Sequence, residues 1–216
     1  MTSSTDCKAT RPFVYLKFAC SLDGFLDNNS NQRHIFSNEL DLRAVDELRA
    51  NSSAILIGAE TLRKDNPSLK LKFLKEKDPL RVVITNSGKL DFSFNFFKDD
   101  GVEKIVYTKQ KLQAVASKVK GLTIVENSKM DLKFILADLH ARGIESLLLE
   151  GGASLIAQFL EQDLVDKIRI AYGNEILGER GKAKLSENIN SVIEGKFEIK
   201  KVSRLQNVNV IELSRV

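Results

Sequence analysis

The segment of the chain best suited to chemistry joins a carboxylate to two glycines: Glu150, Gly151 and Gly152. The preceding residues 147–149 are all leucine, which is typical of a strand buried on both faces of a parallel sheet. From Ala153 onward, the apolar residues have the spacing of a helix face. The pattern predicts a strand, a glycine turn and a helix whose first N–H groups and positive dipole end would bind a phosphate or pyrophosphate.

Two plainer interpretations of this segment stay open. The glycine pair can serve only to close the turn, and Glu150 can serve only to stabilise the positive end of the helix dipole. The dinucleotide fingerprint G-x-G-x-x-G is absent, which argues against an ordinary Rossmann site. An anion held by the same amides would repel a nearby carboxylate, so we expect Glu150 to point past the phosphate toward a substrate.

A single lysine interrupts the apolar run from Phe13 to Ala19. The run itself predicts a core strand. A lysine is seldom fully buried without a partner, so Lys17 either faces solvent or directs its ammonium into a pocket that uses it. Both alternatives are open at this point.

The composition is that of a globular chain. Its 216 residues, 43% of them hydrophobic, suffice for one sizeable core, and we expect a flexible tail over 1–10 and a single domain over 11–216. A formal charge of +4, with lysines and acids interspersed, does not indicate nucleic-acid binding. The two cysteines and two histidines form no disulfide or zinc pattern, and no signal peptide or long apolar span is present, so we expect a metal-free, cytoplasmic protein that does not bind membranes.

Strand and helix patterns alternate along most of the chain. The predicted strands are 13–19, 54–57, 80–85, 105–108, 122–125, 147–149, 165–172, 196–204 and 208–213. The predicted helical segments are 37–49, 61–65, 109–118, 131–142 and the segment from 153. This alternation predicts an α/β fold with a mostly parallel sheet, helices on both faces, and ligands at the carboxyl ends of the strands. The last two strands are separated by a short turn and predict an antiparallel hairpin at one sheet edge.

Three local features complete this interpretation. Ser37 would cap the helix that ends near Arg49. The turn-rich residues 25–33, which follow Gly24, predict a mobile loop. The lysine-dense residues 70–77 predict a solvated strand or loop, with attraction of phosphate groups as the alternative.

Several motifs, taken together and in order, resemble the reductases of riboflavin biosynthesis. They are residues 16–24 (LKFACSLDG), 48–50 (LRA), 54–69 (AILIGAETLRKDNPSL), 81–84 (RVVI), 150–152 (EGG) and 164–166 (LVD). The likeness runs from about Phe13 to Gly178. It implies a dihydrofolate-reductase-like fold, a homodimer, the use of NADPH, and reduction of the ribosylamino side chain of a pyrimidine 5′-phosphate to a ribitylamino chain.

The resemblance also implies roles for individual residues. The implied cofactor contacts are Thr61, Asp65, Gly151, Gly152, Ala153, Ser154 and Leu155, the last five at the pyrophosphate, with Asn86 and Ser87 at the adenosine 2′-phosphate. The implied substrate contacts are Arg49, Ser68 and Lys72 around the 5′-phosphate, and Lys17 and Glu150 near the reacting sugar. In this fold class the peptide between the two glycines is commonly cis, so a cis Gly151–Gly152 bond is expected.

The chemistry of a ribosylamine explains why a cation and a carboxylate would stand together. The sugar must open to an imine before it can accept hydride, and opening needs a proton on the ring oxygen and stabilisation of a cationic nitrogen. We hypothesise that Lys17 hydrogen-bonds or protonates the sugar oxygen. Glu150 would orient the hydroxyls and balance the iminium charge.

The chain departs from the family pattern at two positions. His34 stands where an aromatic residue is common, and Lys72 stands where an arginine is common, so ring packing and bidentate phosphate binding are expected to differ there. No deaminase motif such as H-x-E or P-C-x-x-C is present, which favours the stand-alone reductase acting on the diaminopyrimidinone. The alternatives are the deaminated uracil substrate, a dihydrofolate or other pterin reductase, a non-catalytic nucleotide-binding module, and NADH in place of NADPH.

Overall fold

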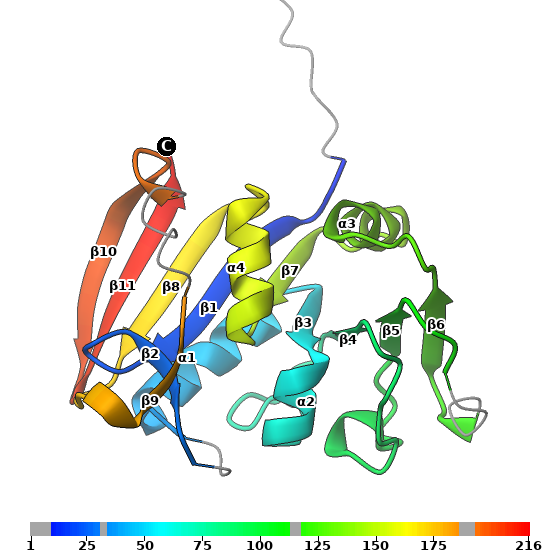
Figure 1. Cartoon of the computed structure of the whole chain (residues 1–216), viewed down its shortest axis with the longest axis horizontal. Helices are drawn as coiled ribbons and strands as arrows, with labels where there is room; N and C mark the ends of the chain where they lie inside the picture. The colour runs from blue at the N-terminus through cyan, green and yellow to red at the C-terminus, as the bar shows by residue number, and fades with distance from the viewer. Residues whose placement is uncertain (1–9, 31–33, 113–117, 186–192) are drawn as a thin grey trace, which may run out of the picture.

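A nine-stranded sheet forms the centre of the computed structural model, which describes residues 10–30, 34–112, 118–185 and 193–216 (Figure 1). Its strands are β1 (Phe13–Cys20), β3 (Ala54–Gly58), β4 (Leu80–Thr85), β5 (Lys104–Thr108), β6 (Leu122–Glu126), β7 (Ser146–Leu149), β8 (Lys167–Tyr172), β10 (Phe197–Leu205) and β11 (Val208–Arg215). Their order is β10-β11-β8-β1-β7-β3-β4-β5-β6. Pairing is parallel from β8 to β6, while β10 and β11 form an antiparallel hairpin at one edge. The predicted fold class is therefore confirmed.

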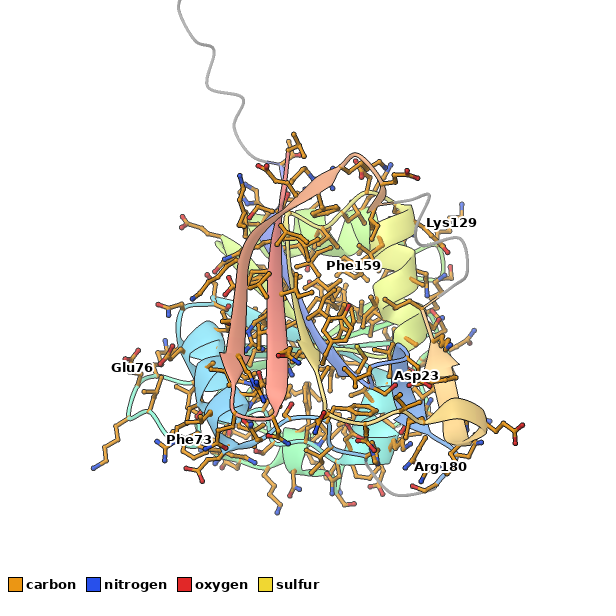
Figure 2. The ribbon with its side chains drawn as sticks, turned by 90° about the vertical axis from the view of Figure 1, so that its left-hand side faces the viewer. Asp23, Phe73, Glu76, Lys129, Phe159 and Arg180 are labelled. Atoms are coloured by element: carbon orange, nitrogen blue, oxygen red, sulfur yellow. The ribbon has the colours of Figure 1, made fainter. Side chains whose placement is uncertain are left out.

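Helices cover both faces of this sheet because its strands are apolar on both sides. They are α1 (Glu39–Ala50), α2 (Ala59–Asp65), α3 (Leu132–Ala141) and α4 (Ala153–Glu161), and Figure 1 shows α4 in front of the sheet and α1 behind it. Leu56 of β3 packs with residues of α3 and α4, whereas its neighbours Ile55 and Ile57 pack with residues of α2. Phe159 is fully buried between α4 and the sheet (Figure 2). The central strands are therefore the near-continuous hydrophobic runs expected of a doubly covered parallel sheet.

A second, two-stranded sheet corrects the prediction of a mobile loop over 25–33. The strand β2 (Phe25–Asn28) pairs antiparallel with β9 (Gly181–Lys184). A Cβ at Gly181 would lie 2.3 Å from the Phe25 ring, so only glycine lets the two strands approach this closely. The partner strand is far away in the sequence, and no local pattern at 25–28 could reveal it. Residues 31–33 lie outside the described part of the chain.

Helix boundaries differ from prediction mainly at their first residues. Asn38, not Ser37, is the N-cap of α1: its side chain accepts a hydrogen bond from the N–H of Asp41. The start of α2 lies at Ala59, two residues before the predicted one, directly after β3. The helix α3 lies within the predicted helix 131–142, with Asp131 as its N-cap and with Leu132, Ile135, Leu136 and Leu139 buried. Part of the predicted helix 109–118 lies outside the described residues, and residues 109–112 are not helical.

Asn38 also ties α1 to the hairpin, since its Nδ2 donates to the carbonyl of Leu205 at 2.7 Å. Among the described residues, no helix has the length and apolar character needed to cross a lipid bilayer.

We predict that Asn38→Ala lowers the free energy of unfolding by about 1 to 2 kcal/mol, because it removes the cap of α1 and the bond to Leu205. The matched change Ser37→Ala should cost less than about 0.5 kcal/mol. Urea denaturation of both variants measures the difference. An equal loss in the two would contradict the assignment of the cap.

Candidate active site

A cleft of about 810 Å³ opens at the carboxyl ends of β1, β3 and β7, within the size range of about 300 to 1,000 Å³ typical of small-molecule sites. Its walls come from the end of β1, from β2 and β9, from α1 and α2, and from the turn that leads into α4. Ligand sites of open parallel sheets are expected at this edge. The loop and strand residues that form the cleft lie far apart in the sequence.

Most of the residues predicted for the site meet in this cleft. Its lining includes Lys17, Arg49, Thr61, Asp65, Ser68, Lys72, Glu150, Gly151, Gly152, Ala153 and Ser154. Three predicted cofactor residues do not line it. Asn86 and Ser87 are exposed beyond the end of β4, and Leu155 is buried beside Gly58 under the first turn of α4. The individual roles of all these residues stay predictions.

The glycine turn has the geometry of an anion cradle. The N-cap of α4 is Gly152, which offers no side chain, so the first N–H groups of the helix lack the usual capping oxygen. Gly151 and Gly152 have φ angles of 120° and 83°, a region that favours glycine. A Cβ at Gly152 would lie 3.2 Å from Thr61 Oγ1. Backbone amides without a capping side chain, next to a hydroxyl, are the kind of groups that bind phosphates in proteins.

The expectation of a cis Gly151–Gly152 peptide is wrong, since this bond is trans in the structure. The two consecutive positive φ angles turn the chain from β7 into α4 without a cis bond. The turn therefore depends on the missing Cβ atoms, which is the property that the glycine pair first suggested.

Glu150 forms a bidentate ion pair with Arg49 of α1. The carboxylate oxygens accept from Nε at 2.6 Å and from Nη2 at 2.7 Å. The two side chains are only 14% and 10% exposed, so the pair is stronger than one on the surface. Burial lowers the pKa of Arg49, but Glu150 and Asp46 outweigh it and hold that pKa above its ordinary value. Two hydrogen bonds from Arg49 thus hold the Glu150 side chain at the wall of the cleft.

Lys17 lies on β1, the strand that pairs with β7 up to Leu149. It is partly buried and lines the cleft, which decides between the two alternatives left open by the sequence. Burial lowers the pKa of Lys17 below its ordinary value, and attraction by Glu150 and Asp41 offsets only part of that effect. A lysine with a lowered pKa is a better proton donor at neutral pH than an ordinary one.

A buried ion pair involves the β8 residue that lies in register with Lys17. Arg169, the β8 residue in register with Lys17, donates from Nη2 to Asp41 Oδ1 at 2.6 Å. Both side chains are at most 4% exposed, and each keeps one buried polar atom without a hydrogen bond. Arg169 acts to lower the pKa of Lys17, whereas Asp41 acts to raise it. The sequence pattern missed this pair, because its two residues come from elements 128 positions apart.

Sequence reasoning also missed polar residues that close the sides of the cleft. Lys64 of α2 forms an ion pair with Asp27 of β2, and both line the cleft.

His34 stands where an aromatic side chain was expected. It bonds Asn28 at 2.9 Å and Glu175 at 2.7 Å. Its ring still packs edge-on against Phe36, at 4.6 Å between centroids. The imidazole therefore keeps the ring contact and adds polar ones.

The fold and the cleft define the class of protein: an open α/β domain whose ligand site lies at the carboxyl ends of parallel strands. The chain belongs to the RibD C-terminal domain family, whose model matches residues 12–211. The resemblance inferred from the motifs is confirmed by this match.

Individual relatives agree with the family. The chain is 34% identical over 184 residues to the 2,5-diamino-6-ribosylamino-4(3H)-pyrimidinone 5′-phosphate reductase of Archaeoglobus fulgidus, covering 79% of this chain and 84% of the relative. It is 36% identical to the riboflavin biosynthesis protein RibD of Chlamydia trachomatis, over 82% of this chain but 49% of that protein. A crystal structure of the Thermotoga maritima diaminohydroxyphosphoribosylaminopyrimidine deaminase/5-amino-6-(5-phosphoribosylamino)uracil reductase superposes with a TM-score of 0.80 at 27% identity, over 95% of this chain and 57% of that chain.

We predict that Lys17→Met raises the melting temperature at pH 7 by about 2 to 4 °C, the shift that about 1 kcal/mol produces in a domain of this size. The pKa of Lys17 is lower in the folded chain than in the unfolded one, so its charged form costs stability below the folded pKa. Removing it leaves no unpaired acid, because Glu150 keeps Arg49.

The rise in melting temperature should shrink as the pH approaches the ordinary lysine pKa. At that pH the parent chain no longer carries a charged Lys17, so the destabilisation disappears there as well. The control is Lys133→Met on the exposed face of α3, which should shift the melting temperature little at any pH. A lower melting temperature for Lys17→Met would show that the ammonium stabilises the fold.

Proposed function

We propose that this chain is an NADPH-dependent reductase of riboflavin biosynthesis. Its substrate is 2,5-diamino-6-ribosylamino-4(3H)-pyrimidinone 5′-phosphate, and its product carries a ribitylamino chain. The observation that carries the proposal is the placement of Lys17 on β1, one residue past the register pair Leu16–Leu149 and so level with Glu150 at the end of β7. Glu150 is paired with Arg49 of α1 and adjoins the glycine cradle of α4. The similarity to the Archaeoglobus fulgidus reductase over most of both chains supports the choice of substrate.

The glycine turn and α2 would hold the cofactor. The bare amides at Ala153 and Ser154 and the hydroxyl of Thr61 suit the pyrophosphate of NADPH or, as the alternative, NADH. Asp65 lines the same wall of the cleft. Asn86 and Ser87 remain the residues proposed for the 2′-phosphate, at the edge of the sheet outside the cleft. When bound, the nicotinamide supplies the hydride for the reduction.

Lys17 acts on the sugar ring. Its ammonium donates a proton to the ring oxygen, the carbon–oxygen bond breaks, and the lone pair of the amino nitrogen forms the carbon–nitrogen double bond of the imine. The lowered pKa of Lys17 favours this transfer, because less free energy is needed to remove the proton. The opened sugar then offers a carbon that can accept hydride.

Glu150 balances the charge that develops on the nitrogen. Arg49 holds both carboxylate oxygens in one plane, so the acid stays ionised and does not swing away as the sugar opens. Arg49, Ser68 and Lys72 form the phosphate side of the substrate site in this proposal. Holding the phosphate and the sugar at two points aligns the imine carbon for transfer.

A second substrate is favoured by one specific observation. The Thermotoga maritima enzyme, whose fold this chain shares, is named as a reductase of the deaminated uracil compound. We also propose that residues 11–216 form one reductase domain and that the protein works as a homodimer in the cytoplasm, as the family resemblance implies.

The proposal is tested by incubating the purified chain with NADPH and each of the two pyrimidine phosphates, following cofactor absorbance and product mass. We expect turnover with the diaminopyrimidinone. Lys17→Met and Glu150→Gln should each lower kcat by about 10² to 10⁴, as loss of a positioned acid or charge does, with little change in NADPH affinity.

The pH profile of kcat/KM should fall on its alkaline side at a lower pH than an ordinary lysine would produce, since the lowered pKa belongs to the proton donor. Dihydrofolate serves as the control substrate. No turnover with either pyrimidine, or unchanged turnover in both variants, would refute the proposed function.

The cofactor site has its own test in Gly152→Ala. The new Cβ would lie 3.2 Å from Thr61 Oγ1, which is a tight contact. The backbone at this position has a φ angle of 83°, which strains any residue other than glycine. NADPH affinity measured by fluorescence titration should fall about tenfold, equivalent to about 1.4 kcal/mol.

Gly143→Ala is the matched control, because Gly143 has a φ angle of 82° but open space around its Cβ. It should lose the same stability without losing affinity for NADPH. Equal affinity losses in the two variants would assign the effect to backbone strain alone.

A further inference from the structure

The loop of residues 68–78, here called the lysine loop, carries two of the proposed phosphate ligands. Ser68 and Lys72 both line the cleft, yet the loop contains neither a strand nor a helix to hold them. Figure 2 shows Phe73 beside α1 and Glu76 farther out, at the edge of the molecule. Something other than regular backbone hydrogen bonding must therefore fix the position of Lys72.

Asp46 of α1 supplies that restraint. Its Oδ2 accepts hydrogen bonds from the backbone N–H groups of both Lys72 and Phe73, the latter at 2.7 Å. The Asp46 side chain is 2% exposed, so these bonds from a carboxylate are shielded from water and strong for their kind. The other Asp46 oxygen lies 3.8 Å from Arg49 Nη1, one turn along the helix.

Other contacts hold the lysine loop at the residues that flank Lys72. Asp78 accepts from the N–H of Leu71 at 2.8 Å, and Arg49 donates to the carbonyl of Lys70 at 3.2 Å. Arg43 stacks over the Phe73 ring at 4.4 Å, but its side chain is half exposed. Asp46 is thus the buried group that holds the backbone of Lys72 itself and also faces Arg49.

We propose that Asp46 is a positioning residue for the phosphate of the substrate: it fixes the backbone of Lys72 beside Arg49, which Glu150 holds, so that both cations face one anion. The inference rests on the proposed function for the identity of the substrate. It goes beyond that function because it makes the carboxylate of Asp46 necessary for binding the substrate phosphate, although both groups are negatively charged. Asp46 itself does not touch the phosphate, because its two oxygens face the loop amides and Arg49.

Two effects of removing the Asp46 charge have opposite signs. If Asp46 acted only through its charge, neutralising it would leave the site more positive, and a phosphate would bind more tightly. If Asp46 acts by position, its loss frees the lysine loop, and a phosphate binds more weakly because the ligands must be ordered on binding. The geometry favours position, since the carboxylate is already engaged with two amides.

The experiment compares Asp46→Asn with Glu47→Gln, its exposed neighbour on α1, which undergoes the same change of charge. The probes are ribose 5-phosphate and ribose, titrated calorimetrically into each purified chain. We expect Asp46→Asn to weaken ribose 5-phosphate binding about tenfold. Ribose binding should be unchanged, Glu47→Gln should match the parent chain, and Asp46→Glu should recover part of the loss.

In the reductase assay, Asp46→Asn should raise KM about tenfold and leave kcat within about twofold, the pattern of lost binding that is common to ground state and transition state. NADPH affinity, measured in parallel, should match the parent and confirms that the variant is folded. Tighter or equal binding of ribose 5-phosphate by Asp46→Asn would overturn the proposal, as would failure of the parent chain to bind it. A parent chain that binds ribose 5-phosphate but reduces neither pyrimidine would refute the proposed function. The role of Asp46 would then be judged from the ribose 5-phosphate titrations alone.

Discussion

The ion pair between Arg49 and Glu150 joins the helix behind the sheet to the strand end where the cleft opens, and the site depends on it. Glu150 is 10% exposed. Removing one partner of such a buried ion pair is costly, because it leaves a poorly compensated charge away from water. The pair therefore requires α1 to stay docked. At the N-terminal end of α1, the hydrogen bond from Asn38 and the ion pair between Asp41 and Arg169 dock the helix. At its C-terminal end, the ion pair of Arg49 does so.

This requirement explains an unusual feature of α1. A helix on a sheet normally buries apolar residues, yet α1 buries Asp41 and Asp46 together with Val45. Each acid is matched by a group from a distant part of the chain: Arg169 for Asp41, and the amides of the lysine loop for Asp46. Buried charges of this kind contribute little net stability, because desolvation offsets much of their attraction. Their effect is to fix geometry around the cleft, where Lys17 is left with a lowered pKa.

The predictions made from sequence were most accurate where a local pattern was sufficient. The bounds of β4 agree with the predicted strand 80–85, and α3 agrees with the predicted helix 131–142 to within one residue at each end, because periodicity is readable within a dozen positions. The errors have long-range causes. The strand β2 exists only because β9 pairs with it, and the cap of α1 lies at Asn38 where the side chain also reaches Leu205. At the site, the glycine turn was found from its residues, but its peptide is trans. Asn86, Ser87 and Leu155 were assigned to the cofactor through the family resemblance but do not line the cleft.

By itself, the sequence determined the family, the alternation of strands and helices, and which residue types could perform the chemistry, because motifs and periodicity are properties of neighbouring positions. Lys17 and Glu150 were identified in this way as residues whose charges required an explanation. Only the tertiary structure decided which charge faces which. It placed Arg49 against Glu150 and Asp46 against the lysine loop, and it lowered the pKa of Lys17 by burial. These outcomes depend on distances between elements up to about a hundred residues apart, since electrostatic and hydrogen-bond energies are set by spatial separation and solvent exclusion.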